Sequence, residues 1–239
     1  MTTTFFYHPE ACLHHVVAFD SSEATHISKA LRLRNLDRID LTNGKGDLFS
    51  AELIIVKHHV SAQIVGLLSA TDTPVLLHLG IAPTKNADRM EWLVEKAVEM
   101  GIGKISLLNC NRSERARLSI DRLERVAISA LKQSRRTILP TIHEAIAFDK
   151  WLALVESDHR FIAHCAEQLP RVLLRDALTS NTSVCIAIGP EGDFSESEIE
   201  QAIQSSFRPV SLGTARLRTE TAALAAVHTF NLHQQISLP

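Results

Sequence analysis

The sequence predicts an α/β protein with a small, mostly β N-terminal domain, residues 1–72, and a larger C-terminal domain, residues 73–239. In the first domain, short apolar segments alternate with turn residues, a pattern typical of strands. After it, apolar strands alternate with amphipathic helices, which indicates a parallel sheet covered on both faces. The change of pattern at residues 70–74, Ala-Thr-Asp-Thr-Pro, predicts the domain boundary.

In the N-terminal domain, three segments have the composition of β-strands and one has that of a helix. The first two strands enclose Asn43-Gly44-Lys45-Gly46, which is typical of a hairpin turn because asparagine and glycine tolerate positive φ. The predicted strands are 36–41, 48–56 and 60–68, and the predicted helix is 22–33.

In the C-terminal domain, apolar strands and amphipathic helices follow one another to the end of the chain. Two helices are predicted to begin with a capping box, Asp88 with Glu91 and Ser195 with Glu198, in which side chain and backbone satisfy each other's free groups. The predicted strands are 75–81, 104–108, 160–164, 184–188 and 210–212, and the predicted helices are 88–100, 121–134, 148–155, 171–178, 195–205 and 219–233.

Composition indicates a globular protein that stays in the cytoplasm. The 239 residues are 45% hydrophobic and 22% charged, so a sizeable core can form, and no apolar run reaches the ~20 residues of a membrane span. The N-terminus lacks the basic start and the apolar stretch of a signal peptide, so we expect a cytoplasmic protein without membrane contact. The four cysteines are scattered and are expected to be reduced. The twelve histidines lack the spacing of metal ligands, so we expect no metal site.

The charge is unevenly distributed. The chain has a net charge of −2, but residues 112–136 contain eight basic and three acidic residues, which makes this segment +5 and the remainder −7. A second basic cluster comprises Lys29, Arg32, Arg34 and Arg38. Clustered cations are typical either of solvated helix faces or of a surface that contacts a polyanion such as a nucleic acid, and both interpretations remain open.

Two loops have the arrangement of ligand sites. Strand 184–188 leads into Gly189-Pro190-Glu191-Gly192 before a capped helix, and strand 210–212 leads into Gly213 before a helix that begins near Thr219. Ligands bind at such strand–loop–helix connections because backbone amides converge there and glycine allows close approach. The sequence has neither a G-x-x-x-x-G-K-[ST] motif nor a strand followed by G-x-G-x-x-G, which argues against a P-loop nucleotidase and an ordinary dinucleotide-binding enzyme.

At these loops the sequence resembles the SPOUT-class RNA methyltransferases, and within them the 16S rRNA uridine-N3 methyltransferase group. The resemblance covers nearly the whole chain, and it lies in the order and spacing of several short motifs. These are His26-Ile27-Ser28-Lys29-Ala30-Leu31-Arg32, then Lys85, Glu91, Lys96 and Glu99-Met100-Gly101, Gln133-Ser134-Arg135-Arg136 with Pro140, Ile188-Gly189-Pro190-Glu191-Gly192, Leu212-Gly213, and Leu217-Arg218-Thr219-Glu220-Thr221-Ala222.

The resemblance implies a PUA-like β-barrel that binds RNA, followed by a SPOUT domain with a trefoil knot. It implies that the cofactor is S-adenosylmethionine and that the product is N3-methyluridine. It also implies that the protein is a homodimer and that it binds 16S rRNA within the small ribosomal subunit. Two alternatives remain, namely a SPOUT methyltransferase for another rRNA or tRNA base, and a non-catalytic RNA-binding factor in ribosome assembly. We expect the ligand-shaped loops to be unnecessary in such a factor.

The resemblance also assigns residues to roles. Arg218 and Glu220 are the catalytic candidates, with Glu220 as acceptor of the uridine N3 proton and Arg218 as the group that orients the uracil or stabilises charge on its carbonyl oxygens. The expected cofactor-binding residues are His164, Cys165, Ala166, Gly189, Pro190, Glu191, Gly192, Leu212, Gly213, Leu217 and Ala222. The expected RNA-binding residues are Lys29, Arg32, Arg34, Lys85, Arg112, Gln133 and Arg136.

Three residues depart from the family pattern. Asp193 stands where a second glycine is usual, Ala215 where an arginine is usual, and Phe5 where an arginine is common. We further expect a side chain at position 192 to obstruct the cofactor. The apolar composition of residues 222–227 leads us to expect helix 219–233 in a dimer interface, unless it is enclosed within one chain.

Overall fold

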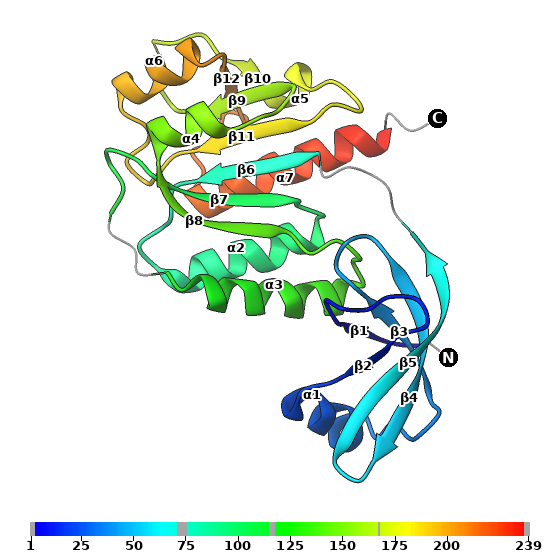
Figure 1. Cartoon of the computed structure of the whole chain (residues 1–239). Helices are drawn as coiled ribbons and strands as arrows, with labels where there is room; N and C mark the ends of the chain where they lie inside the picture. Colours follow the sequence, from blue (N-terminus) through cyan, green and yellow to red (C-terminus); the bar gives the residue numbers. More distant parts are fainter. Residues whose placement is uncertain (1–2, 71–75, 115–117, 167, 237–239) are drawn as a thin grey trace. The chain divides into compact units, whose positions relative to one another are not determined.

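A computed structural model of the chain describes residues 3–70, 76–114, 118–166 and 168–236. The chain divides into two compact units (Figure 1). The first unit contains the described residues of Met1–Thr73 together with Leu131–Leu139, and the second contains those of Pro74–Ala130 and Pro140–Pro239.

The first unit is built on a five-stranded sheet with the order β1-β3-β4-β5-β2. β1 and β3 are parallel, and the other neighbours are antiparallel. Alternate residues of β4, namely Phe49, Ala51 and Leu53, are buried in its core, as expected of a strand with one covered face. The strands are β1 (Thr4–Tyr7), β2 (Val16–Ala18), β3 (Arg38–Thr42), β4 (Leu48–Val56) and β5 (His59–Ser69).

The turn between β3 and β4 follows the chemistry of its residues. The Asn43 side-chain oxygen accepts hydrogen bonds from the backbone nitrogens of Lys45 and Asp47, at 2.8 and 3.3 Å. Gly44 has φ +75°, a conformation that glycine adopts without the steric cost of a β-carbon. The hairpin predicted at these residues is therefore present.

The helix predicted at residues 22–33 is shorter than expected. α1 (Ser21–Thr25) is capped by Asp20, whose side chain accepts from the Glu23 nitrogen at 2.8 Å, and it continues as one π-helical turn, η1 (His26–Ala30). The chain then leaves the helix, because Arg32 has φ +56°, outside the helical region.

Residues 131–139 belong to the first unit although they lie far along the chain. Lys132 forms an ion pair with Glu23 at 2.7 Å, and Lys45 pairs with Ile138 in an antiparallel bridge. Arg135 forms an ion pair with Asp40, and its guanidinium lies 5.6 Å from the centre of the Phe5 ring. Phe5, which departs from the family pattern, thus packs under a cation.

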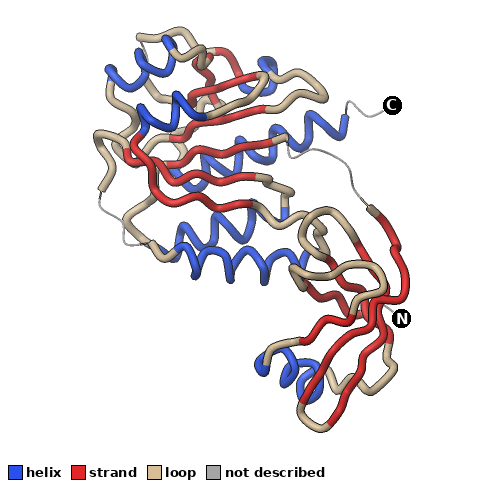
Figure 2. The backbone as a smooth tube through the Cα atoms, viewed as in Figure 1, coloured by secondary structure: helices blue, strands red, loops and turns tan. Residues whose placement is uncertain are grey.

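The second unit is built on a seven-stranded sheet in which every neighbouring pair is parallel, which confirms the predicted parallel sheet. Figure 2 shows its strands side by side. Its order is β10-β12-β9-β11-β6-β7-β8. Every residue of β11 is buried, so helices cover both faces at the centre of the sheet. The strands are β6 (Leu77–Ile81), β7 (Lys104–Asn109), β8 (Thr141–Ala147), β9 (His159–Ala163), β10 (Val172–Leu173), β11 (Val184–Ile188) and β12 (Arg208–Ser211).

The helices of this region pack in two groups. α7 packs on α2, α5, β6 and β11, and α4 packs on α6, β7 and β8. The last turn of α3, from Leu131, belongs to the first unit. The helices are α2 (Ala87–Glu99), α3 (Ile120–Ser134), α4 (Phe148–Leu154), α5 (Leu174–Ala177), α6 (Glu196–Gln204) and α7 (Thr219–Ile236).

Three local predictions in this unit are wrong. The Asp88–Glu91 capping box is absent, because Asn86 caps α2 by accepting from the Asp88 nitrogen at 2.8 Å, and Glu91 instead pairs with Arg122 at 2.6 Å. The helix predicted at 171–178 is the short strand β10 followed by the single turn α5, because residues 172–173 pair with β12. The edge strand β8 was not predicted, since most of its residues are exposed and carry no apolar run.

α7 owes its apolar composition to packing within the chain. Its buried apolar residues are Ala223, Leu224, Ala226, Val227 and Phe230. Packing within one chain therefore explains the apolar composition of these residues, and the dimer interface stays a prediction. The outward face of α7 carries Thr221, His228 and Leu232, which are exposed, and Ala225, which is half-buried. Within the described residues, no helix combines the length and the apolar character that crossing a membrane requires.

Candidate functional site

Three loops at the carboxyl ends of neighbouring strands enclose a large cleft in the second unit. We name them the β9 loop (described residues 164–166 and 168–171), the β11 loop (189–195) and the β12 loop (212–218). The cleft has a volume of about 1110 Å³, and a smaller cavity of about 70 Å³ shares several of its lining residues. Ligands of α/β sheets bind at such carboxyl ends, so this cleft is the candidate site.

The cleft and the smaller cavity together are lined by all of the residues that the sequence assigned to the cofactor. Nine of them line the large cleft, and His164 and Leu212 line the smaller cavity. The residues in the large cleft are Cys165, Ala166, Gly189, Pro190, Glu191, Gly192, Gly213, Leu217 and Ala222. Further lining residues that the sequence did not indicate are Gln168, Arg171, Glu196, Thr214 and Arg216.

The β11 loop turns tightly where β11 ends. A β-carbon at Gly189 would lie 3.0 Å from the Phe194 ring and 3.2 Å from the Phe194 nitrogen, so only glycine fits there without displacement of its neighbours. At Gly192, a β-carbon would lie 3.4 Å from that of Arg112, an ordinary contact. A β-carbon at 192 therefore meets Arg112 first, and because Gly192 lines the cleft, the expected obstruction of the cofactor by a larger side chain stays a prediction.

Asp193 ties the β11 loop to the β9 loop. Its φ is +62°, which explains why glycine is usual at this position, and its nitrogen donates to the Pro190 carbonyl at 2.9 Å. One carboxylate oxygen accepts from the Phe194 nitrogen and the other from the Cys165 nitrogen, both at 2.8 Å. The carboxylate therefore joins two sides of the cleft.

The segment after β7 holds the β11 loop from its other side. Arg112 donates to the Gly192 carbonyl at 2.9 Å, and the Asn111 nitrogen donates to the Glu198 carboxylate at 2.7 Å. Glu198 also accepts from the Ser195 nitrogen at 2.8 Å, which completes the predicted capping box of α6. Arg112, an expected RNA-binding residue, thus also anchors a loop of the cleft.

His164 gives the β9 loop a fixed imidazole. The Ala166 nitrogen donates to Nδ1 at 3.2 Å, so the proton of the neutral ring resides on Nε2. Burial lowers the pKa of His164, the positive charge of Arg171 lowers it further, and the carboxylate of Asp193 opposes both effects. The side chain is 4% exposed, and its Nε2 has no hydrogen-bond partner among the described residues.

The β12 loop is more exposed than the other two. Thr214, Ala215, Arg216 and Arg218 are exposed, and Gly213 has φ +126°. The Ser211 hydroxyl donates to the Gly213 carbonyl at 2.9 Å and accepts from the Gly213 nitrogen at 3.2 Å. These contacts are local, so the loop is held mainly at its ends.

The two catalytic candidates lie in different surroundings. Arg218 lines the cleft and is exposed. Glu220 is buried in the first turn of α7, does not line the cleft, and its Oε1 lies 3.7 Å from Nε of Arg89 on α2. Its Oε2 has no hydrogen-bond partner among the described residues. Sequence reasoning did not identify Arg89, because no local pattern links it to a glutamate 131 positions away.

The expected RNA-binding residues are distributed over both units. Lys29, Arg32 and Arg34 are exposed in the first unit, at η1 and the turn after it. Gln133 and Arg136 are exposed in the 131–139 segment of the same unit. In the second unit, Lys85 is exposed and pairs with Glu114 at 3.0 Å, while Arg112 lines the cleft.

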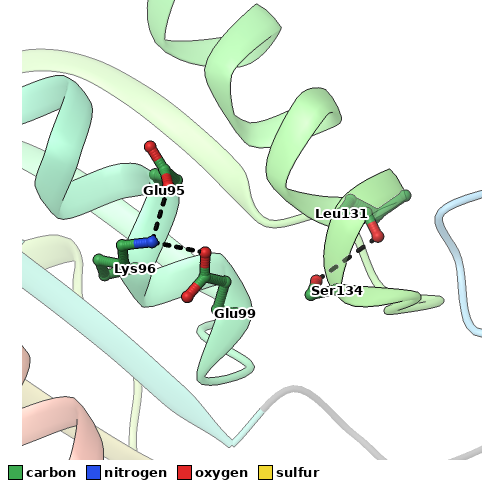
Figure 3. Close-up of polar contacts among 5 residues, drawn as sticks. All are labelled: Glu95, Lys96, Glu99, Leu131 and Ser134. Carbon is green, nitrogen blue, oxygen red and sulfur yellow. Dashed lines mark hydrogen bonds and ion pairs between the residues drawn. The ribbon is translucent and has the colours of Figure 1, made fainter.

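Two residues of the family motifs, Lys96 and Ser134, form hydrogen bonds within their own helices. Lys96 bonds to Glu95 and Glu99 at 2.7 and 2.8 Å, and these hydrogen bonds raise the pKa of its ammonium group (Figure 3). The Ser134 hydroxyl donates to the Leu131 carbonyl at 3.5 Å in the last turn of α3 (Figure 3). The cysteines are free thiols, and the described residues contain no group of three or more His, Cys, Asp or Glu side chains arranged around a metal position.

Comparison with known proteins adds independent information. A family model described as an RNA methyltransferase domain matches residues 71–231. The ribosomal RNA small subunit methyltransferase E of Buchnera aphidicola subsp. Acyrthosiphon pisum is 30% identical over 219 residues, which are 87% of this chain and 85% of that protein.

Two solved structures are similar over almost their full length. A probable rRNA methyltransferase from Porphyromonas gingivalis has a TM-score of 0.90 and 37% identity, with 98% of this chain and 100% of that chain covered. The ribosomal RNA small subunit methyltransferase E from Neisseria gonorrhoeae, solved bound to S-adenosyl methionine, has a TM-score of 0.83 and 27% identity, with 98% of each chain covered.

Proposed function

The chain belongs to the RNA methyltransferase family, and on that premise we propose that it transfers a methyl group from S-adenosylmethionine to N3 of a uridine in the 16S RNA of the small ribosomal subunit. One observation carries the proposal. The β9, β11 and β12 loops, which contain the motifs shared with the family, enclose one cleft of about 1110 Å³ at the carboxyl ends of their strands. Relatives over nearly the full length of the chain are ribosomal RNA methyltransferases by name.

The residues of the cleft suit the chemical groups of S-adenosylmethionine. Guanidinium groups of Arg112 and Arg171 suit a carboxylate, and the carboxylate of Glu191 suits an ammonium group or ribose hydroxyls. Apolar side chains of Leu217 and Ala222 suit the face of an adenine ring. When bound, this cofactor supplies an electrophilic methyl group on a positively charged sulfur.

The chain's own residues must then activate the uridine. N3 carries a proton and is a poor nucleophile until that proton is removed. Because the buried carboxylate of Glu220 does not line the cleft, we assign this proton to Glu220 through a water, with Oε2, which has no donor among the described residues, as the acceptor. Arg218 orients the uracil and stabilises negative charge on its carbonyl oxygens, a role that its exposed position in the cleft supports.

The first unit is proposed to be a PUA-like barrel that binds RNA. Register shifts between β4 and β5 at residues 48–51 support it, because such irregularities bend a sheet toward closure. Lys29, Arg32 and Arg34 form its proposed phosphate-binding surface. Reversal of all three charges to glutamate should weaken RNA binding, lower the salt slope by roughly 0.7–0.9 per lost contact, and leave cofactor affinity unchanged. Removal of residues 1–72 is a poorer test, because the segment Leu131–Leu139 would lose Glu23, Asp40 and Lys45, with which it pairs.

Within the second unit, we propose that the cofactor loops form the trefoil knot of the SPOUT fold. After β12, the chain passes the positions of β9 and β11 in the sheet, and α7 packs on β11 and β6, which supports this path.

We also propose a homodimer that uses the outward face of α7. Leu232, 46% exposed on that face, gives the probe Leu232→Glu, and Val56→Glu in the first unit is its matched control.

Light scattering tests the dimer. The wild type and the Val56→Glu variant should scatter as twice the chain mass of 26.5 kDa, and Leu232→Glu should scatter as the single chain. A wild-type monomer with full methylation activity contradicts the dimer.

The function is tested in two steps. Calorimetry with S-adenosylmethionine should give one bound molecule per chain, whereas a non-catalytic assembly factor should bind none. Mapping of methylated bases in rRNA from a strain without this protein should show one missing N3-methyluridine in 16S rRNA, restored by the wild type and not by Arg218→Ala. A missing methyl group on another rRNA or tRNA base would replace the substrate while retaining the reaction class.

A further inference from the structure

We propose that Asp193 is a positioning residue that holds the β9 and β11 loops in the geometry that binds the methyl donor, a role that rests on the proposed function. Asp193 is partly buried and lines the cleft. Its carboxylate accepts hydrogen bonds from two backbone nitrogens, one in each loop.

The hydrogen bond to Cys165 has no substitute in this part of the chain. Among the described residues of the two loops, it is the one side-chain hydrogen bond that joins them. Beyond the ends of β9 and β11, where the last paired residues are Ala163 and Ile188, the strand ladder no longer fixes the distance between the loops. Ala166 and Leu169 of the β9 loop pack against the core cluster that contains Phe194, and the Asp193 carboxylate adds the direct polar link between these two sides of the cleft.

The backbone at Asp193 separates this role from a contribution to folding. With φ +62°, the residue adopts a conformation that glycine tolerates better than any residue with a β-carbon. Glycine at this position should therefore fold well and still lack the carboxylate. A residue that affected binding only by keeping the loops folded would lower stability and cofactor affinity together when removed, whereas a positioning residue lowers affinity without a loss of stability.

Pre-organisation explains how the carboxylate affects affinity. A ligand that binds between two loops must first order them if nothing else does, and this ordering weakens the observed affinity. Backbone N–H groups that donate to a carboxylate form charge-assisted hydrogen bonds, which are stronger than those between neutral groups. The two bonds of Asp193 thus keep the loops ordered before the cofactor arrives.

Four variants test the role. Asp193→Gly removes the carboxylate and suits the backbone, and Asp193→Asn keeps one acceptor oxygen and tolerates positive φ. Asp158 provides the matched control, because its carboxylate also joins β9 to β11, but at their amino ends, where it accepts from the Ser183 nitrogen and hydroxyl at 2.8 and 2.7 Å. Asp158→Gly and Asp158→Asn complete the set.

For Asp193→Gly we expect the Kd for S-adenosylmethionine to rise about tenfold, the size expected from loss of one charge-assisted hydrogen bond. The KM for the donor should rise with it, kcat should change less than about twofold, and Tm should not fall. Asp193→Asn should lie between Asp193→Gly and the wild type. Asp158→Gly should lower Tm and leave donor affinity unchanged. In the ligand-free protein, the Cys165 amide should exchange its hydrogen faster in Asp193→Gly than in the wild type.

The possible outcomes separate this role from the proposed function. A wild type that binds donor, together with an Asp193→Gly variant of equal affinity or equal Cys165 exchange, overturns the positioning role alone. Parallel loss of Tm and affinity in Asp193→Gly also overturns it, because the residue would then be structural. A wild type that does not bind S-adenosylmethionine overturns the proposed function, and the positioning role with it.

Discussion

The β11 and β12 loops look alike in the sequence and differ in the structure. Each follows a short apolar strand, contains glycine and ends at the start of a helix. The β11 loop is held by Asn111, Arg112 and Cys165, and by the capping box of α6. The β12 loop, among the described residues, makes its hydrogen bonds only with its own neighbours in the chain.

This difference suits the two loops to different roles at the same cleft. A loop fixed from both sides presents backbone groups in a constant geometry, which suits the binding of a cofactor. A loop held at its ends can change its conformation when a larger substrate arrives, which is common for groups that complete a catalytic site. Arg218 belongs to the second kind of loop, and Gly189 and Glu191 belong to the first.

The largest effect is expected from a change in the β12 loop, and it should lower the reaction rate. Arg218→Ala should lower kcat by about 100-fold or more, as removal of a group that stabilises developing negative charge does. Because Arg218 is exposed, thermal melting and donor affinity should change little. Steady-state methylation of 16S rRNA, with Arg175→Ala as the matched exposed control, measures this separation. A lower Tm in Arg218→Ala would show that the β12 loop is anchored after all.

The next largest effect is expected from a change at Glu198, which anchors the β11 loop, and it should lower the stability of the fold. Glu198 is 4% exposed and accepts hydrogen bonds from Asn111 and Ser195. Glu198→Ala leaves these backbone donors without partners, which should lower the free energy of unfolding by about 3 kcal/mol. Glu200→Ala, an exposed change in the same helix, should cost less than about 0.5 kcal/mol. Equal denaturation midpoints for the two variants would contradict the anchoring.

The same contrast explains which features the sequence could predict. The Ser195–Glu198 capping box and the Asn43–Gly46 turn are encoded within three or four consecutive positions, and both are present. The continuous apolar run of 184–188 predicted a fully buried strand with the bounds that the structure has. Such features depend on neighbours in the chain, so local chemistry is enough to predict them.

Features that depend on distant residues were not predictable in this way. Residues 172–173 form a strand because β12 lies beside them, although the local sequence favours a helix. The Arg89–Glu220 pair and the Asp193–Cys165 hydrogen bond join residues that no spacing connects. The motifs predicted residues that gather at the cleft and the adjoining cavity, and their role in cofactor binding stays a prediction, whereas the contacts that hold each loop follow from the tertiary fold.

A smaller effect distinguishes the two glycines of the β11 loop. A β-carbon at Gly189 would press on Phe194, whereas one at Gly192 would make an ordinary contact with Arg112. Gly189→Ala should therefore weaken donor binding about tenfold through displacement of the loop, an effect of the size expected of an overpacked site. Gly192→Ala should change donor affinity less than about twofold. Calorimetry on the two variants measures the difference, and equal affinities would contradict the assigned role of the Gly189–Phe194 contact.

The smallest effect is expected from a change of pH, which acts on His164 in the β9 loop. Burial lowers the pKa of His164 from its ordinary value of 6.5, so the folded protein favours the neutral ring that accepts from the Ala166 nitrogen. Since the pKa is lower in the folded state than in the unfolded state, the stability that His164 contributes is present above pH 6.5 and is lost as the pH falls through the lowered value.

Protonation of His164 also removes the acceptor that holds Ala166 in the β9 loop. Donor affinity should therefore decrease as the pH falls through the lowered pKa of His164, below 6.5, and calorimetry across this range measures the decrease. In His164→Gln, whose side chain does not titrate, this dependence should be reduced. His143→Gln, which changes an exposed histidine outside the cleft, should keep the wild-type dependence. A His164→Gln variant with the full wild-type dependence would assign the effect to another group.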